Sequence, residues 1–356
     1  MGFEAENYDI AIIGAGPAGA TAARLLDSRF RVIVIDKKGA GGAFCKPCGG
    51  LLAMDAQKAL SKFNLTLPKD VLVDPQIFAV KTIDPKQRLL RYYQRFYINL
   101  DRHKFDMWLM SLIPGRVEVA GNYVCTDIQR RGGAYEITFT DGGGATRKIT
   151  AKYVIGADGS SSLTRQKLFP RRKIRRYLSI QQWFSERHTT PFYSCVFDSD
   201  ITDSYCWSIS KDGNFILGGA FPPETGRERF ELLKQKLAAR GFSFGEPLKT
   251  EACMVSMPRG IRDFCAGGDG AFLIGEAAGF ISPSSLEGIS YALDSAYALA
   301  RILNSGCAKP EWEYRKKSLP MRVKLLMKYV KSLFMYTPFL RKLVMKSGIM
   351  SIDVDD

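Results

Sequence analysis

The chain has 356 residues, enough for two domains that each have their own core. Its hydrophobic share of 46% and charged share of 24% are ordinary for a globular protein, whereas its net charge of +15 is unusual. Such a charge favours anionic partners, which are nucleic acid, phosphorylated substrates or an acidic membrane face. No apolar run is long enough to span a bilayer and no signal peptide precedes the first strand, so we expect a cytoplasmic protein.

The first segment predicts a dinucleotide site. An apolar strand over 8–13 runs into a glycine turn over 14–19 and then a helix over 20–27, and a second apolar strand ends on Asp36. In this pattern the glycines permit a tight turn and a close approach of pyrophosphate to the helix N-terminus, and the acid accepts ribose hydroxyls. The alternative is a glycine-rich turn that only packs. The residues predicted for the site are Gly14, Gly16, Pro17, Ala18, Gly19, Asp36 and Lys37.

The next part of the chain carries a loop with one CxxC pair, Cys45 and Cys48, followed by Gly49 and Gly50. The paired glycines predict backbone lying against a flat ring, with an ordinary turn as the alternative. The eight cysteines are scattered, which indicates reduced thiols. Because there is no second ligand pair and the chain has only two histidines, we expect no metal site.

Further elements follow in order. We expect a helix over 54–63, strands over 77–98 around a turn at Pro85, a helix over 101–109 and three short strands over 117–149.

The second half begins with an apolar strand over 153–157 that delivers Asp158 and Gly159. Strands return over 192–221 with a hairpin turn at 211–214, and a surface helix is expected over 227–240. A strand over 271–274 then ends in Gly275 and Glu276, and a helix is expected over 289–303.

Three separated motifs resemble the flavoprotein superfamily that includes aromatic hydroxylases of the p-hydroxybenzoate hydroxylase type and geranylgeranyl reductases. The first is the glycine turn. The second, Asp158-Gly159 with Arg165, resembles the superfamily's DG signature, and the third, Gly275 to Gly279, resembles its GD signature with Glu276 in place of Asp. The resemblance implies an α/β plus antiparallel β fold: a Rossmann-like FAD-binding domain of the glutathione-reductase type, an inserted β-sheet substrate domain and a helical C-terminal tail.

Within the superfamily the sequence is most similar to geranylgeranyl reductases. Residues 46–50 resemble their Cys-Gly-Gly motif beside the isoalloxazine, residues 283–289 their Pro-x-x-Gly-Glu-Gly-Ile loop, and residues 205–211 their Tyr-x-Trp-x-Phe-Pro-Lys motif. Glu276, together with Leu286 for a loop Gly and Ser210 for the motif Pro, resembles the bacterial CbrA-like branch. The resemblance implies further cofactor contacts at Cys48, Gly49, Gly50, Arg102, Val124, Asp158, Gly275, Glu276, Gly288 and Ile289.

The expected domains follow from this resemblance. They are an FAD-binding domain over 1–76, 99–168 and 262–306, a substrate domain over 77–98 and 169–261, and a basic helical C-terminal segment over 307–356.

The predicted chemistry is hydride transfer from reduced flavin to a carbon–carbon double bond of an isoprenoid or polyprenyl lipid. Only one dinucleotide fingerprint is present, so NADPH or another reductant visits transiently and the electron donor is not identified. Cys48 and Tyr205 are the candidate catalytic proton donors, with structural roles as the alternative. Tyr205 and Trp207 are two apart on a strand and face the same side, which suits either a substrate cavity or a sandwich core.

The C-terminal segment is amphipathic and basic. Val323, Leu326, Met327, Val330 and Phe334 recur at helical spacing, and Lys324, Lys328 and Lys331 share another face. This pattern predicts peripheral docking on the anionic inner face of the membrane. The alternative is a helix that covers the substrate domain with its lysines in water.

Other functions stay open. An FAD-dependent monooxygenase of the same fold and a flavin-loaded lipid-binding protein without turnover are the alternatives to the reductase. A nucleic-acid-associated flavoprotein is indicated by charge alone, and without an aromatic-and-basic recognition module we expect no nucleic-acid partner.

Overall fold

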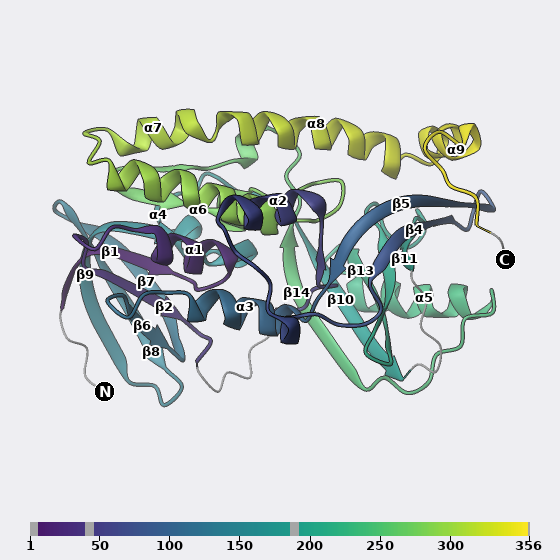
Figure 1. The fold of residues 1–356 in the computed structure, drawn as a ribbon, viewed down its shortest axis with the longest axis horizontal. Helices are drawn as coiled ribbons and strands as arrows, with labels where there is room; N and C mark the ends of the chain where they lie inside the picture. Colours follow the sequence, from purple (N-terminus) through teal and green to yellow (C-terminus); the bar gives the residue numbers. More distant parts are fainter. Residues whose placement is uncertain (1–5, 40–45, 186–191, 355–356) are drawn as a thin grey trace. The chain divides into compact units, whose positions relative to one another are not determined.

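The computed structural model describes residues 6–39, 46–185 and 192–354. Contacts within the chain divide it into two compact units, and each unit contains a large sheet (Figure 1). The first unit comprises Met1–Cys45, Phe105–Arg175 and Ser256–Met327. The second unit comprises Lys46–Lys104, Arg176–Val255 and Lys328–Asp356.

The sheet of the first unit has a parallel core. Its strands are β1 (Asn7–Ile13), β2 (Val32–Asp36), β6 (Glu118–Gly121), β7 (Tyr123–Arg131), β8 (Ala134–Asp141), β9 (Thr146–Gly156), β15 (Gly267–Gly268) and β16 (Ala271–Leu273). The parallel strands follow the order β16-β9-β1-β2-β6, and β8 and β7 continue antiparallel from β9.

Strand β1 lies inside this sheet and is covered on both faces. Ile10 and Ile12 belong to one buried cluster, together with residues of helices α1 (Pro17–Leu25) and α6 (Ile289–Asn304). Ala11 and Ile13 belong to a second cluster, together with residues of β7 and β8. A strand buried on both faces needs apolar side chains at successive positions, which explains the uninterrupted apolar run in the sequence.

The second unit contains a mostly antiparallel sheet in the order β14-β10-β13-β12-β11-β4-β5-β3. The strands β10, β13, β12 and β11 run antiparallel, as do β4, β5 and β3, and the parallel pair of β11 with β4 joins the two groups. The strands are β3 (Leu51–Leu52), β4 (Ile77–Asp84), β5 (Leu89–Asn99), β10 (Arg176–Ser185), β11 (Phe192–Val196), β12 (Cys206–Lys211), β13 (Asn214–Phe221) and β14 (Lys249–Ser256).

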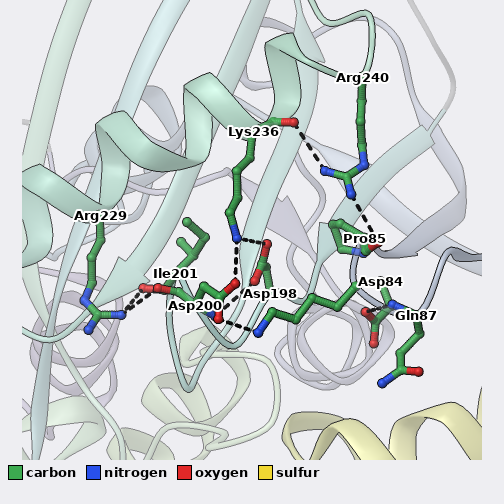
Figure 2. Close-up of polar contacts among 10 residues, drawn as sticks. Asp84, Pro85, Gln87, Asp198, Asp200, Ile201, Arg229, Lys236 and Arg240 are labelled. Atoms are coloured by element: carbon green, nitrogen blue, oxygen red, sulfur yellow. Dashed lines mark hydrogen bonds and ion pairs between the residues drawn. The ribbon is translucent and has the colours of Figure 1, made fainter.

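One face of this second sheet packs against α5 (Gly226–Ala238). Phe230 and Leu233 of the helix join Leu217 and Phe221 of β13 in one buried cluster. Hydrogen bonds and ion pairs also connect the helix to neighbouring loops (Figure 2).

Lys236 of α5 and Arg240, just after the end of the helix, make some of these polar contacts. Lys236 Nζ lies 2.9 Å from carboxylate oxygens of both Asp198 and Asp200, and Arg240 donates to the carbonyl oxygen of Pro85 at 3.1 Å. Part of the basic charge of the chain is therefore used inside the second unit and is not offered to an anionic partner.

The helices expected over 54–63, 101–109, 227–240 and 289–303 are confirmed, and the one expected over 20–27 is α1, which begins earlier, at Pro17. The first four correspond to α2 (Met54–Lys62), α3 (Arg102–Ser111), α5 and α6. The remaining helices are α4 (Leu163–Leu168), α7 (Pro310–Lys317), α8 (Leu319–Tyr336) and α9 (Pro338–Ser347). In the described part of the chain, no helix combines the length and apolarity needed to cross a membrane.

The strands between residues 117 and 157 differ from the prediction. We expected a short strand before Ile149 and a separate one from Tyr153, whereas β9 runs without interruption through both. Its first half pairs with β8 and its second half pairs with β1 and β16, so the residues between the two predicted strands stay extended.

The division into units also differs from the expected domains. Residues 46–76 lie with the second sheet, because Leu51 and Leu52 pair with β5. The C-terminal segment is not separate: it divides after Met327, and its last part belongs to the second unit.

Candidate functional site

The glycine turn of the first unit has the backbone that the sequence pattern requires. Gly14 has a φ of +100°, and a Cβ there would lie 2.6 Å from the carbonyl oxygen of Ala157. A Cβ on Gly19 would lie 1.8 Å from the carbonyl oxygen of Gly14, so the helix could not sit as close to the strand. In contrast, the position of a Cβ on Gly16 is open, with no atom within 4 Å. The turn therefore has two packing glycines and one that faces free space.

Asp36 holds this turn to the end of β2. It is buried, and its carboxylate accepts the N–H of Ala15 at 2.5 Å and the N–H of Lys38 at 2.6 Å. The sequence assigned this acid to ribose hydroxyls, and each oxygen still has lone-pair capacity beyond the bond it already accepts. Lys37 is exposed at the surface.

Lys38 and Asp106 form a buried ion pair that sequence reasoning missed. The ammonium lies 2.9 Å from the carboxylate, and both side chains are almost completely enclosed. No sequence signal links the two residues, because they are far apart in the chain and a lysine after a strand is normally a surface charge.

Two helix N-termini in the first unit lack side-chain caps. Gly16 is the N-cap of α1, with Pro17 at the first helical position, and Gly288 is the N-cap of α6, which begins at Ile289. Neither helix has an acidic residue in its first turn. Both ends therefore present unpaired backbone N–H groups and the positive end of the helix dipole, which favour an anionic or electron-rich ligand group.

Arg165 connects the two other motifs of the first unit. Its guanidinium is buried and donates to the carbonyl oxygens of Ala277 at 3.1 Å, Asp263 at 2.7 Å and Arg172 at 2.6 Å. Burial lowers the pKa of Arg165. The arginine of the DG signature thus holds the loop that carries the Gly275–Gly279 motif.

Asp158 has an internal role in the same region. Its carboxylate accepts Ser162 Oγ at 2.5 Å and the N–H and Oγ of Thr164 at 3.0 and 3.1 Å, while burial raises its pKa. These contacts shape the turn that leads into α4. A contact of Asp158 with a cofactor stays a prediction.

The Gly275–Gly279 loop has a conformation that depends on its glycines. Gly275 has a φ of +56° and donates its N–H to Ser295 Oγ at 2.9 Å, and Glu276 Oε1 accepts the N–H of Ser256 at 2.8 Å. Farther on, Leu286 has a φ of +54°, a left-handed backbone where the geranylgeranyl reductase loop has glycine. A leucine thus adopts a backbone conformation that glycine adopts more easily.

The Cys48–Gly50 loop lies in the second unit and surrounds a buried lysine. Cys48 Sγ accepts the N–H of Gly50 at 3.4 Å, and a Cβ on Gly50 would lie only 2.3 Å from the carbonyl oxygen of Leu100 and 2.4 Å from Lys211 Nζ. A Cβ on Gly49 would meet no atom within 4 Å. Cys45 lies outside the described residues.

Lys211 ends β12 with its ammonium against this loop. Only 4% of the residue is exposed, and its Nζ donates to the carbonyl oxygen of Leu100. Burial lowers the pKa of Lys211 to about 8, while Cys48 and two nearby aspartates act in the opposite direction. This lysine is the last residue of the 205–211 motif. We predicted no role for it from the sequence, because a lysine before a hairpin turn is normally solvated.

Tyr205 and Trp207 lie on the face of the second sheet that is opposite to α5. Their ring centroids are 5.6 Å apart, while Cys206 between them packs in the α5 cluster. Trp207 crosses the neighbouring strand at Gly218, where a Cβ would lie 2.5 Å from the indole. The shared face predicted for the two rings is therefore confirmed.

The polar atoms of these rings differ in their contacts. The Tyr205 hydroxyl accepts a hydrogen bond from Tyr193 at 3.3 Å. Trp207 Nε1 is buried and has no hydrogen-bond partner among the described residues. A buried donor without an acceptor is uncommon and marks a position where a ligand atom can accept.

The two other predicted cofactor residues are Arg102 and Val124. Arg102 is the first residue of α3 and is half-buried. Val124 is on β7 with 53% of its surface exposed. Their contacts with a cofactor stay predictions.

The fold is shared with solved flavin-dependent enzymes. A geranylgeranyl bacteriochlorophyll reductase-like protein from Thermoplasma acidophilum matches with a TM-score of 0.77 and 18% identity, covering 95% of this chain and 91% of that chain. PqsL of Pseudomonas aeruginosa, a probable FAD-dependent monooxygenase, matches with a TM-score of 0.71 and 18% identity over 96% of this chain and 99% of that chain. No protein-family model matches the sequence. The fold is that of these flavoproteins.

The sequence itself has much nearer relatives. Protein CbrA of Escherichia coli O6:H1 is 52% identical over 349 residues, which cover 98% of this chain and 95% of that protein. Protein CbrA of Shigella sonnei is 51% identical over 349 residues, which cover 98% of this chain and 98% of that protein. The chain belongs to the CbrA family.

Proposed function

We propose that this protein is an FAD-dependent reductase that saturates carbon–carbon double bonds of an isoprenoid or polyprenyl lipid. The FAD part rests on the glycine turn, with its open Gly16 position, and on the flavin-dependent enzymes that share the fold. The reductase part rests on the geranylgeranyl reductase-like neighbour and on the aromatic face of Tyr205 and Trp207.

The residues of the first unit fit a dinucleotide. The Gly16 position leaves room for a pyrophosphate at the uncapped N-terminus of α1, and the buried Asp36 carboxylate is available to ribose hydroxyls. The N-terminus of α6 is a second uncapped end for an electron-rich group of the cofactor. When bound and reduced, FAD supplies the hydride, and NADPH or another two-electron reductant that visits transiently restores it.

The observation that carries the substrate assignment is the aromatic face of the second sheet. Tyr205, Trp207 and Ile209 follow one another on one side of the chain, and all three are buried. Such a face provides apolar contact for a prenyl chain and excludes water from the reacting bond. Saturating a double bond adds one hydride and one proton, so the site also needs a proton donor.

Three groups are candidate proton donors, and two of them lie at the Lys211 end of this face. The Cys48 thiol lies in the loop that packs on Lys211, and the lowered pKa of Lys211 permits its ammonium to release a proton near neutral pH. The Tyr205 hydroxyl, which pairs with Tyr193, is the third candidate.

The experiment is anaerobic reoxidation of dithionite-reduced protein by a polyprenyl phosphate, with the flavin absorbance as the readout. The proposal expects the released flavin to be FAD and the lipid to reoxidise it. In a parallel run with oxygen, a hydroxylated product would favour the monooxygenase. Lipid binding without reoxidation would favour the lipid-binding protein.

A further inference from the structure

We propose that the second-unit part of α8, from Lys328 onward, and α9 form an exposed apolar face that docks on the surface of an anionic lipid bilayer. This inference concerns a surface distinct from the flavin and substrate residues, and it holds whatever reaction the protein catalyses. The patch, named here the tail face, consists of the exposed apolar side chains of Val330 and Phe334 on α8, those of α9, and the two residues that follow Gly348.

A continuous apolar stripe runs along α8. At about 100° per residue the stripe falls within an arc of about 80°, and its members are between 47% and 68% exposed. The opposite side of the helix carries the buried Leu325 and Ser332, and Lys324 and Lys331 lie on the flank. The stripe residues are Leu319, Val323, Met327, Val330 and Phe334.

Helix α9 repeats this arrangement. Phe339 and Leu343 are exposed one turn apart, and the exposed Lys346 lies one turn farther along. Ile349 and Met350 follow, with 68% and 76% of their surfaces exposed. Exposed apolar side chains in such a group normally mark an interaction surface.

The second part of the tail face is anchored to the sheet and is not a loose end. Arg341 on the inner side of α9 pairs with Asp84 of β4 at 2.7 Å, and both side chains are buried. After α9, Ile352 forms a β-bridge with Tyr92 of β5. These contacts fix which side of α9 faces outward, so its phenylalanine and leucine are exposed by the fold.

The charge of the tail selects the kind of partner. Between Tyr314 and Ile352 the sequence has ten lysines and arginines and no acidic residue. Lys328 pairs with Asp55 and Arg341 with Asp84, whereas Lys342 and the exposed Lys346 lie on α9 beside its apolar side chains. Basic side chains around an apolar face complement anionic lipid headgroups above an acyl layer. A second copy of the chain would bring the same positive charge and be repelled.

The structure corrects two details of the sequence pattern. Leu326 packs against the core cluster of the first unit and does not belong to the stripe. Lys324 lies 5.9 Å from the ring centroid of Tyr291 and Lys328 has its carboxylate partner, so reversing these lysines would disturb internal contacts as well as the surface. Lys342 and Lys346 are better positions for a charge test.

The test is co-sedimentation of the full-length protein with vesicles of phosphatidylglycerol or of phosphatidylcholine. We expect binding to phosphatidylglycerol to be at least tenfold stronger than to phosphatidylcholine, and to fall when salt shortens the range of the charge interaction. Phe334→Ser with Phe339→Ser, and separately Lys342→Glu with Lys346→Glu, should each weaken binding to phosphatidylglycerol at least tenfold.

Each variant has a matched control elsewhere on the second unit. Leu248→Ser removes an apolar side chain that is 64% exposed, and Lys69→Glu with Arg227→Glu reverses two exposed charges. Both controls should bind like the wild type, and thermal melts should show that all variants fold. Equal binding to both lipids, or variants that bind no worse than their controls, would overturn the proposal.

A dimer would also overturn it. If the wild type is a dimer that binds no vesicles, and Phe334→Ser with Phe339→Ser makes it a monomer, the tail face joins two copies of the chain. Because the measurement involves no turnover, failure here leaves the proposed reductase reaction standing, and failure of the reaction leaves this result standing.

Discussion

Lys211 is a charged residue whose position is hard to explain by stability alone. Its ammonium is enclosed among Leu100, Gly50 and the Cys48 loop, and burial lowers its pKa to about 8. Burying a charge costs free energy unless the group is paired and hydrogen-bonded, and groups with strongly shifted pKa values cluster at functional sites.

The lowered pKa predicts a stability that rises with pH. From about pH 8 to 10.5 the folded state has lost the Lys211 proton that the unfolded state still holds, so the free energy of unfolding should increase. The gain is about 3 kcal/mol over this window, and it is absent below pH 8. Lys211→Met should lack the gain, as measured by urea unfolding at several pH values. The exposed Lys69→Met is the control, and an unchanged pH dependence in Lys211→Met would contradict the assignment.

At the scale of elements, the glycine turn between β1 and α1 contains one glycine needed for packing and another expected to leave room for a ligand. Gly19 is needed because the helix packs against the turn, whereas the Gly16 position faces free space in the protein alone. Substitutions at the two glycines should therefore fail in different ways.

We predict that Gly16→Val keeps the stability of the cofactor-free protein but loses FAD, since its side chain occupies the pyrophosphate position. Gly19→Ala should lower the melting temperature of the cofactor-free protein by several degrees, because its Cβ would clash with a backbone oxygen. Thermal melts of the flavin-free proteins and FAD titration measure the two effects. Equal melting temperatures for the two variants would contradict this distinction.

Strand β12 carries the second prediction at this scale. Trp207→Ala removes an indole from the aromatic face but none of the glycine-turn contacts, so FAD content should stay unchanged. Binding of polyprenyl phosphate should weaken by about 1–3 kcal/mol if the indole makes ordinary apolar contact. Flavin retention and lipid affinity are the measurements. Loss of FAD as complete as in Gly16→Val would place the tryptophan in the structural core.

The same elements show which features of the fold could be predicted from the sequence and which could not. The apolar run of β1 and the glycine spacing predicted the local turn, because both depend on neighbouring residues. The Lys38–Asp106 and Arg341–Asp84 pairs were not predictable, since each joins residues distant in the chain. Strand β10 was not predicted, because its first residue, Arg176, ends a run of basic residues over 171–176 that is typical of a solvated loop.

At the scale of the whole molecule, the positive charge has two separate uses. Some basic side chains, such as Lys236 and Arg341, are consumed in internal ion pairs. The tail from Tyr314 to Ile352 keeps a concentration of basic residues beside exposed apolar ones. The basic side chains are thus divided between internal ion pairs and the C-terminal tail.

The central claim is that the protein saturates a double bond of a polyprenyl lipid with FAD as the hydride carrier. Mass spectrometry of the lipid after anaerobic incubation with FAD-loaded, reduced protein tests it most directly. The account predicts a product that has gained two hydrogens for each saturated bond, and two deuteriums when the reaction is run in heavy water. A lipid that is bound but recovered chemically unchanged from the anaerobic incubation, or one that gains an oxygen atom in a parallel incubation in air, would contradict this assignment.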